Sequence, residues 1–440
     1  MTPVRPDSRR PAPAPAPAPG RHPIGRLRWW IVGLALFGTT ANYIARSALG
    51  SAAPTLVKTL HMSTAQYSYV VAAFQLAYTL VQPIAGIVLD LFGTRVGLTV
   101  FAVAWSLANM AHALATGWPS LAVFRGLLGL SEGAVIPAGL KAVAEWFPDR
   151  ERSVAFGWVN AGTSLGGMIA PPLVIGCILA GSWQLAFLVT GGIGLVWAAG
   201  WFAFYRTPQT HSRIGPEERA YIEAGQSPSA GPAARGAWRT VLASRKFWAT
   251  AVPRFLSEPA WQTFNFWIPL YLVSVRHMDL KEIAMFAWLP FLAADLGSIV
   301  GGYVAPVMMR LTGANLFAAR KFTVLSGALL MLGPACIGLA PNAYVAIALF
   351  CLGGFAHQLL SGALTTLSAD LFPREQVATA SGLAGTASWT GGLLFSLLVG
   401  QLAAIIGYNP LFASLAAFDL AGAAILFVLL RPTSQMGAAA

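Results

Sequence analysis

Long runs of apolar residues recur along almost the whole chain. The first, RWWIVGLALFGTTANYIARSALGSAAPTLV, covers residues 28–57. A helix needs about 20 predominantly apolar residues to cross the hydrocarbon core of a bilayer. Of the 440 residues, 56% are hydrophobic and only 10% are charged, whereas soluble domains carry about 25% charged residues. The sequence therefore predicts an all-α membrane protein that crosses the bilayer many times.

We expect twelve membrane-spanning helices in two groups of six, separated by one long polar stretch at 206–246. Within that stretch, GPEERAYIEAG is expected to form a short surface helix. Lys and Arg favour cytoplasmic loops, and most of the 28 basic residues fall in the tails and in the loops on one side, so both termini are predicted to be cytoplasmic. The predicted spans cover about residues 29–56, 66–89, 96–116, 119–146, 152–179, 183–205, 247–274, 281–309, 320–340, 342–369, 376–406 and 408–430.

The first residues of the chain differ from the rest. MTPVRPDSRRPAPAPAPAPG alternates Pro with Ala, which excludes an α-helix, and it has no apolar stretch of the kind found in a signal peptide. The chain is therefore divided into a disordered Pro/Ala-rich cytoplasmic tail (1–25), an N-terminal six-helix bundle (26–205), a cytoplasmic linker (206–246), a C-terminal six-helix bundle (247–431) and a C-terminal tail (432–440).

An internal repeat indicates that the two groups of helices are related. Residues 144–167 read AEWFPDRERSVAFGWVNAGTSLGG, and residues 369–392 read ADLFPREQVATASGLAGTASWTGG. A Phe-Pro pair, a single glycine and a double glycine all match at one offset of 225 residues, without a gap. Two six-helix halves related by parallel pseudo-symmetry describe the major facilitator fold.

A short motif follows the second predicted span, in the stretch GIVLDLFGTRVGL. It resembles the loop signature of the major facilitator superfamily, in which glycines allow a tight turn and close helix packing, and an acid and a base bind helix ends as a gate. The family usually has a second basic residue where this chain has Thr94. The resemblance implies that the gating motif consists of Gly86, Asp90, Gly93 and Arg95.

A narrower resemblance covers about residues 26–430. Stretches such as PRFLSEPAWQTFNFWIPLYL and GGFAHQLLSGALTTLSADLF are similar to bacterial hexuronate transporters of the anion:cation symporter family. This likeness implies a multi-pass protein of the bacterial inner membrane that imports glucuronate and galacturonate with protons by alternating access. Two alternatives remain open: a proton symporter for another sugar acid, such as galactonate or glucarate, and an organic-anion exchanger or exporter of the same fold.

Three charged residues inside predicted spans are candidates for the transport chemistry. A guanidinium costs about 2.5–3.5 kcal/mol at a helix centre on insertion scales, so Arg46 should face the bundle interior. Arg125 and Glu132 are seven residues apart, about two helical turns, and share a face. The planar guanidinium matches a carboxylate, so we expect Arg46 and Arg125 to bind the substrate and Glu132 to carry the proton. The alternative is that these residues form internal ion pairs that only shape the bundle.

Related sugar-acid symporters tend to carry an acid directly before this arginine, at the place where this chain has Ala45. Without an adjacent counter-ion, Arg46 is expected to find its partner in the substrate carboxylate. Proton coupling then depends on Glu132, with Glu258 and His357 in reserve. Glu258 also lies one turn after Arg254, so an internal ion pair between these two is the competing interpretation.

A sugar acid also needs hydrogen-bonding groups and a flat apolar surface for its ring. Polar side chains recur at helical spacing in several spans, and tryptophans lie close to some of them. The further candidates for substrate binding are Tyr43, Asn42, Gln75, Tyr78, Asn160, Thr163, Trp261, Gln262, Asn265, His357, Ser361 and Trp389.

The sequence carries no pattern of an enzyme that we recognise. Walker A, GxSxG, HExxH and CxxC motifs are absent, and the three cysteines have no metal or redox spacing. The net charge of +12 is explained by the insertion signal and not by nucleic-acid binding. We therefore expect a transporter without metal or cofactor, acting as a functional monomer in the lipid bilayer, whose partners are a sugar acid and protons.

Overall fold

The computed structural model describes residues 26–226, 237–372 and 374–430. The regular structure of these ranges is entirely helical. The predictions made for the Pro/Ala-rich tail and for the C-terminal tail lie outside the described residues.

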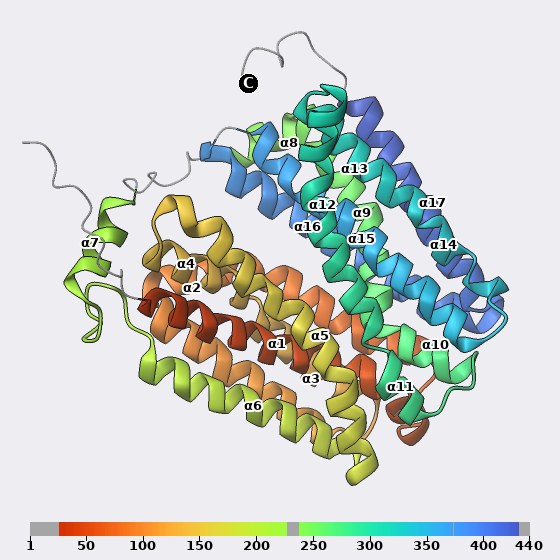
Figure 1. Ribbon diagram of the computed structural model, residues 1–440. Coiled ribbons are helices and arrows are strands. Elements are labelled where there is room, and N and C mark those ends of the chain that lie inside the picture. The colour runs from red at the N-terminus through yellow and green to blue at the C-terminus, as the bar shows by residue number, and fades with distance from the viewer. Residues whose placement is uncertain (1–25, 227–236, 373, 431–440) are drawn as a thin grey trace, which may run out of the picture.

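The helices form two groups joined by a linker (Figure 1). The linker carries α7 (Pro216–Ala224) and α8 (Ala237–Ala243). The first group consists of α1 (Leu27–Thr59), α2 (Thr64–Ala111), α3 (Trp118–Glu132), α4 (Val135–Trp146), α5 (Arg152–Ala180) and α6 (Trp183–Phe204), with short 3-10 turns at His112–Leu114 and Asp149–Glu151. The second consists of α9 (Arg245–Phe266), α10 (Ile268–Ser274), α11 (Leu280–Phe286), α12 (Leu289–Thr312), α13 (Leu316–Leu330), α14 (Leu332–Ala335), α15 (Ala343–Leu371), α16 (Arg374–Ile406) and α17 (Tyr408–Leu429), with a 3-10 turn at Ile337–Leu339.

The two groups lie close together near α10 and α11 and spread apart toward α7 and α8, an end that we call the linker end (Figure 1). Contacts between the groups run from α2 to α16, from α1 to α10 and from α5 to α11 and α12. The Tyr67 hydroxyl donates to the carbonyl oxygen of Phe266 at 2.9 Å, and Gln75 donates to the Ser396 hydroxyl at 3.2 Å.

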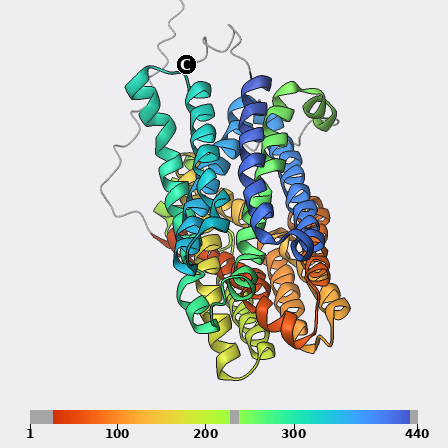
Figure 2. The same ribbon diagram turned by 90° about the vertical axis from the view of Figure 1, so that its right-hand side faces the viewer.

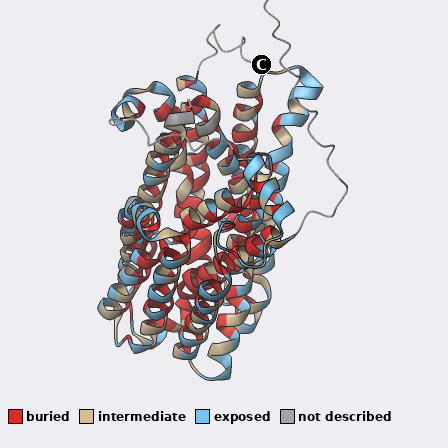
Figure 3. Ribbon diagram, turned by 90° about the vertical axis from the view of Figure 1, so that its left-hand side faces the viewer, coloured by how far each residue is buried: buried red, intermediate tan, exposed pale blue. Residues whose placement is uncertain are grey.

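Nine helices in the described part of the chain are long and apolar enough to cross a membrane. Most of the long helices run in roughly one direction when the molecule is viewed from its side (Figure 2). Buried residues gather between the helices, whereas many large apolar side chains, such as Leu91, Val196 and Leu311, are exposed (Figure 3). An outward-facing apolar surface on apolar helices is what a bilayer requires. The predicted spans 29–56, 66–89 and 247–274 are not among the nine.

Several spans that we predicted as single helices are interrupted. The span at 119–146 is divided between α3 and α4 at Gly133 and Ala134, and the span at 247–274 is divided between α9 and α10 at Trp267. Conversely, α2 runs through two predicted spans and turns at Gly93, whose φ of 74° and ψ of 163° are readily adopted only by glycine.

Small residues on α5 allow it to pack closely on α1. A methyl group at Gly162 would lie 2.5 Å from the carbonyl oxygen of Leu36, and one at Gly166 would lie 2.5 Å from Cβ of Tyr43. Both glycines are needed for this approach, as GxxxG spacing predicts. The contact also fixes the position of Tyr43 in the middle of α1.

The surface helix predicted in the linker is confirmed as α7. Its Glu218 is buried, and its carboxylate accepts hydrogen bonds from the backbone N–H groups of Leu27 and Arg28 at the start of α1. The same carboxylate pairs with the Arg28 guanidinium at 3.3 Å. These contacts attach α7 to the first group of helices.

Candidate functional site

A buried ion pair lies in the middle of the first group of helices. Nε of Arg46, on α1, lies 2.8 Å from a carboxylate oxygen of Glu132, at the end of α3. The two residues are 4% and 0% exposed. Arg46 therefore has a protein counter-ion, as the alternative of an internal ion pair predicted, and this acid comes from another helix instead of from the neighbouring position 45.

Arg125 lies beside this pair but makes no hydrogen bond or ion pair with Glu132 in the described structure. Its Nη2 donates to the backbone carbonyl oxygen of Arg46 at 3.1 Å. Its Nε and Nη1, and the second carboxylate oxygen of Glu132, have no hydrogen-bond partner among the described residues, although all are buried. Arg125 and Glu132 thus lie in one cluster, as their spacing predicted, but the acid pairs with Arg46.

Aromatic rings surround the Arg46 guanidinium. Its carbon lies 4.4 Å from the ring centre of Tyr43, 4.6 Å from that of Tyr78 and 5.8 Å from that of Trp389. The rings of Tyr78 and Trp389, which come from different groups of helices, lie 4.4 Å apart. A cation held over aromatic faces is stabilised electrostatically, and these contacts join the ion pair to the second group.

The second group contributes a carboxylate of its own, Glu258 on α9. Gln262 donates to one of its oxygens at 2.8 Å, and the Ser388 hydroxyl donates to the other at 2.6 Å. Among the described residues, no ion pair within 4.0 Å joins Glu258 to Arg254, but the charge of Arg254 acts on Glu258, as does the charge of Arg46.

A second aromatic surface is formed by residues of the second group of helices. The rings of Trp261 and His357 stack at 5.8 Å with an interplanar angle of 13°. His357 is 2% exposed, and its Nδ1 has no partner in the described structure. Asn265 donates to the carbonyl oxygen of Trp261 at 2.8 Å. Ser361 lies one turn beyond His357 and is half-buried.

The remaining predicted binding residues lie in varied surroundings. Asn42 is fully buried, and neither atom of its amide group has a partner among the described residues. Gln75 is engaged by Ser396 at the contact between the two groups. Asn160 is exposed and Thr163 is half-buried on α5, and within the described structure neither side chain has a hydrogen bond. Sequence reasoning missed Ser388, although it directly precedes Trp389 in a polar stretch.

The predicted gating motif forms contacts within the first group only. Asp90 pairs with Lys141 of α4 at 2.6 Å. Arg95 donates from two nitrogens to the carbonyl oxygen of Phe202, at 2.8 and 2.9 Å, near the end of α6. Gly93 forms the turn, but a methyl group at Gly86 would meet nothing within 4 Å, so no close packing requires that glycine here.

Comparison with known families agrees with this architecture. The family model described as "Major Facilitator Superfamily" matches residues 35–318 and residues 304–439. The chain belongs to the major facilitator superfamily. A hexuronate transporter of Escherichia coli (strain K12) is 52% identical over 407 residues, which are 92% of this chain and 94% of that protein.

Other members of the superfamily extend the comparison. A galacturonate transporter of Dickeya chrysanthemi is 53% identical over 325 residues, 73% of this chain and 94% of that protein. A D-galactonate transporter of Escherichia coli is 28% identical and covers 94% of this chain and 98% of that protein. Within the superfamily, the chain thus belongs with the hexuronate transporters, and it is a multi-pass protein of the bacterial inner membrane.

Solved structures agree with the fold. The crystal structure of a bacterial homolog to the human lysosomal transporter Spinster, in an inward-facing and occupied conformation, aligns with a TM-score of 0.73. It covers 92% of this chain and 97% of that chain at 17% sequence identity, so the likeness concerns the fold alone.

Proposed function

We propose that this member of the superfamily imports hexuronates, glucuronate and galacturonate, together with protons. The similarity to a hexuronate transporter and a galacturonate transporter supports the substrate class. The observation that carries the proposal is the buried Arg46–Glu132 pair beside Arg125, whose Nε and Nη1 have no hydrogen-bond partner among the described residues. A carboxylate entering this cluster would meet two charged donors that no protein group occupies there.

The ion pair suggests how a proton and a substrate are coupled. While Glu132 is ionised, it competes with a substrate carboxylate for the Arg46 guanidinium. A proton on Glu132 removes that competitor, so the substrate anion binds more tightly when the proton is present. By linkage, bound substrate favours proton binding to the same degree, which is the requirement for symport. Glu258, held by Gln262 and Ser388, is a second proton site in this proposal.

The sugar ring would lie between the two groups of helices. Trp261, stacked on His357, and Trp389 offer flat surfaces, and Gln262 and Ser361 offer hydrogen-bonding groups beside them. The first group of helices would thus bind the substrate carboxylate, and the second would form hydrogen bonds with the hydroxyls of the sugar ring. Asn42, whose amide is buried without a partner, is a further donor and acceptor on the carboxylate side.

We also propose the topology and the transport cycle. The chain would cross the membrane twelve times, with bundles at 26–205 and 247–431, the linker 206–246 and both termini in the cytoplasm, and would act as a monomer. The spread of the two groups at the linker end corresponds to a state open to the cytoplasm (Figure 1). Alternating access would close this end and open the end at α10, with Asp90 and Arg95 exchanging partners as a gate.

Uptake into proteoliposomes tests the function. Radiolabelled glucuronate and galacturonate should accumulate when an inward proton gradient is imposed, and accumulation should fall at least tenfold without it. Galactonate and glucarate should compete weakly. Uptake that ignores the gradient but depends on internal anion would favour an exchanger, and preferential uptake of galactonate or glucarate would favour the other sugar-acid symporter.

A further inference from the structure

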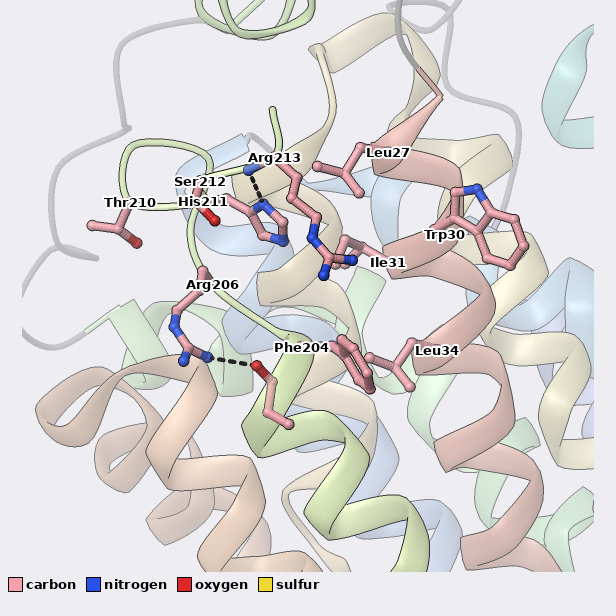
Figure 4. Close-up of a pocket in the computed structure, with 11 residues that line it drawn as sticks. Leu27, Trp30, Ile31, Leu34, Phe204, Arg206, Thr210, His211, Ser212 and Arg213 are labelled. Atoms are coloured by element: carbon pink, nitrogen blue, oxygen red, sulfur yellow. Dashed lines mark hydrogen bonds between the residues drawn. The ribbon is translucent and has the colours of Figure 1, made fainter. Parts of the chain in front are cut away.

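A cavity lies at the linker end, between the start of α1 and the loop that follows α6 (Figure 4). It has a volume of about 710 Å³, and its lining residues all belong to the described part of the chain. It is separate from the Arg46–Glu132 cluster, since no residue of that cluster lines it.

Positive charge gathers at this cavity. Arg206 and Arg213 line it, and none of its lining residues is acidic. Nη1 of Arg206 donates to backbone carbonyl oxygens at the end of α6, so Arg206 is held in place and contributes its charge there. The Arg213 guanidinium points into the cavity toward Ile31, and among the described residues it has no acid within 4.0 Å (Figure 4). Burial lowers the pKa of His211 below its ordinary value, so this ring is neutral near pH 7 and the charge comes from the arginines.

The opposite wall of the cavity is apolar. Ile31 and Leu34 of α1 lie across from Phe204 at the end of α6, and their side chains face one another beneath the Arg213 guanidinium (Figure 4). Trp30, on the outer edge, is 77% exposed. Exposed tryptophan on a membrane protein is typical of the level of the lipid headgroups, so the cavity has its charged part in water and its apolar part in the acyl region.

The loop at 206–213, which carries both arginines of the cavity, is fixed by several contacts. The indole of Trp146 donates to the carbonyl oxygen of Arg206 at 3.0 Å, and the ring of His211 packs edge-on against the same indole at 5.5 Å. The carbonyl oxygen of Thr207 accepts hydrogen bonds from the backbone N–H groups of Thr210 and His211. The cavity is therefore preformed, which lowers the entropic cost of binding a ligand.

From these features we infer that the cavity binds the headgroup of an anionic phospholipid. The phosphate would lie between Arg213 and Arg206, with the Ser212 hydroxyl beside it, and an acyl chain would pass between Leu34 and Phe204. Basic pockets between membrane helices recognise lipids by this combination of charge above and apolar surface below. The inference goes beyond the proposed transport function and needs only that the chain lies in a membrane.

Native mass spectrometry of the detergent-purified full chain tests the inference. The protein is equilibrated with equal amounts of phosphatidylglycerol and phosphatidylcholine, and the retained lipids are counted. We expect one preferentially retained phosphatidylglycerol, and Arg213→Gln should lower its retention about fivefold, the weight of one basic residue near an anionic surface. The matched control is Arg239→Gln, an exposed arginine over the ring of the exposed Trp238 on α8, outside the cavity. It should leave retention unchanged.

Four results would overturn the inference. Three concern retention: equal retention of the two lipids by the unaltered chain, an unchanged count for Arg213→Gln, and an equal loss in Arg239→Gln. The fourth comes from competition with soluble anions. Competition arms with inorganic phosphate and glycerol 3-phosphate distinguish a lipid site from a simple anion site, because neither has an acyl chain. Displacement of phosphatidylglycerol by millimolar inorganic phosphate would show that the site binds free anions instead. Because no transport is measured, failure here says nothing about uptake.

Discussion

At the scale of single residues, Arg46 shows how a charge is held inside a membrane protein. Its guanidinium makes an ion pair of 2.8 Å with Glu132 and lies over the rings of Tyr43 and Tyr78. The cost of burying the charge, about 2.5–3.5 kcal/mol on insertion scales, is offset by these contacts together. The preceding Ala45 is 1% exposed, so an acid there would also be buried.

Glu132→Gln should separate proton coupling from substrate translocation. The amide keeps the size of the side chain and can still accept a hydrogen bond from Arg46, but it binds no proton at neutral pH. We expect uptake to become independent of the imposed proton gradient, while exchange of internal for external glucuronate stays within about threefold of the unaltered protein. The measurement is proteoliposome uptake with and without the gradient. Full retention of gradient stimulation would exclude Glu132 as the proton carrier.

Arg125→Lys should weaken substrate binding without removing the charge. Lysine presents a point charge in place of the planar fork, so a carboxylate loses the second parallel hydrogen bond. We expect the dissociation constant for glucuronate to rise about tenfold, which corresponds to about 1.4 kcal/mol. Isothermal titration calorimetry at constant pH measures it. An unchanged constant would mean that Arg125 only braces the backbone of Arg46.

The partner of each charge could not be predicted from the sequence. Spacing along one helix correctly predicted that Arg125 and Glu132 share a face. Whether Glu132 pairs with Arg46 or with Arg125, however, depends on how α1 and α3 are placed against each other. That placement is set by side-chain packing between distant segments, which no periodicity within one helix reports. Glu258 shows both cases, because Gln262 lies one turn after it on α9, whereas Ser388 comes from the distant α16.

At the scale of elements, the packing of α1 on α5 positions the ion pair. A methyl group at Gly166 would lie 2.5 Å from Cβ of Tyr43 and 2.6 Å from the carbonyl oxygen of Thr40. Because Tyr43 lies over Arg46, any separation of the two helices also moves the cation. Gly166, although distant from the charged residues in sequence, therefore helps to fix the position of the site.

Gly166→Ala should lower both stability and uptake. Forcing a methyl group into this contact costs about 1–3 kcal/mol, and the displaced Tyr43 should reduce uptake at least fivefold. Gly157→Ala on the same helix is the control, since a methyl group there meets nothing within 4 Å. Thermal unfolding in detergent and uptake in liposomes measure the two effects. Equal behaviour of the two variants would contradict the packing argument.

Gly93→Ala should destabilise the turn inside α2. The backbone at Gly93 has φ 74° and ψ 163°, and a side chain in this region costs about 1–3 kcal/mol. Gly86→Ala should be neutral or slightly stabilising, because that glycine is helical and has open space around it. The melting temperatures of the two variants in detergent measure this difference in stability. A greater loss at Gly86 would show that the packing role implied by the family motif applies in another state of the cycle.

Element positions were predicted better than element continuity. Apolar length located the long helices, and the stretch GPEERAYIEAG was correctly expected to form the short helix α7. The interruption between α3 and α4 was missed, although Pro137 lies in the first turn of α4. Proline has no N–H to donate to the carbonyl oxygen of Gly133, four residues earlier, and this breaks the helix at that point. Helix α8 was missed because it is too short to show a period.

At the scale of the whole molecule, the described structure is closed at one end and spread at the other. Ser68 on α2 lies against Gly400 on α16, where a methyl group on the glycine would lie 2.2 Å from Cβ of the serine. Tyr67 and Gln75 cross to the second group on the same part of α2. If the groups rock during transport, these contacts must break once in every cycle.

Gly400→Ala should weaken the closed end. A methyl group there would lie 2.2 Å from Cβ of Ser68, so the contact between α2 and α16 must open. We expect the melting temperature in detergent to fall and glucuronate uptake to drop about fivefold. Gly385→Ala on the same helix is the control, since a methyl group there meets nothing within 4 Å. Equal behaviour of the two variants would rule out a tight contact at this point.

The division into two halves was predictable, but the conformation was not. The repeat at an offset of 225 residues indicates two related groups of helices, since duplicated segments tend to fold alike. Which end is closed depends on small differences in free energy between contacts such as that of Tyr67 with Phe266 and those of the opposite end. Such a balance between two packed states leaves no pattern in the sequence.

The ion pair of Arg46 with Glu132 lies wholly within the first group of helices, whereas Trp261, Gln262 and His357 come from the second. In the proposed mechanism, the groups that bind the carboxylate and the first proton lie in one half, and the groups that contact the sugar ring lie in the other. Under that proposal, substitutions in α9 and α15 that spare Glu258 would change the preferred sugar acid while the Arg46–Glu132 pair stays intact. A library restricted to those two helices is the natural starting point for redirecting the transporter.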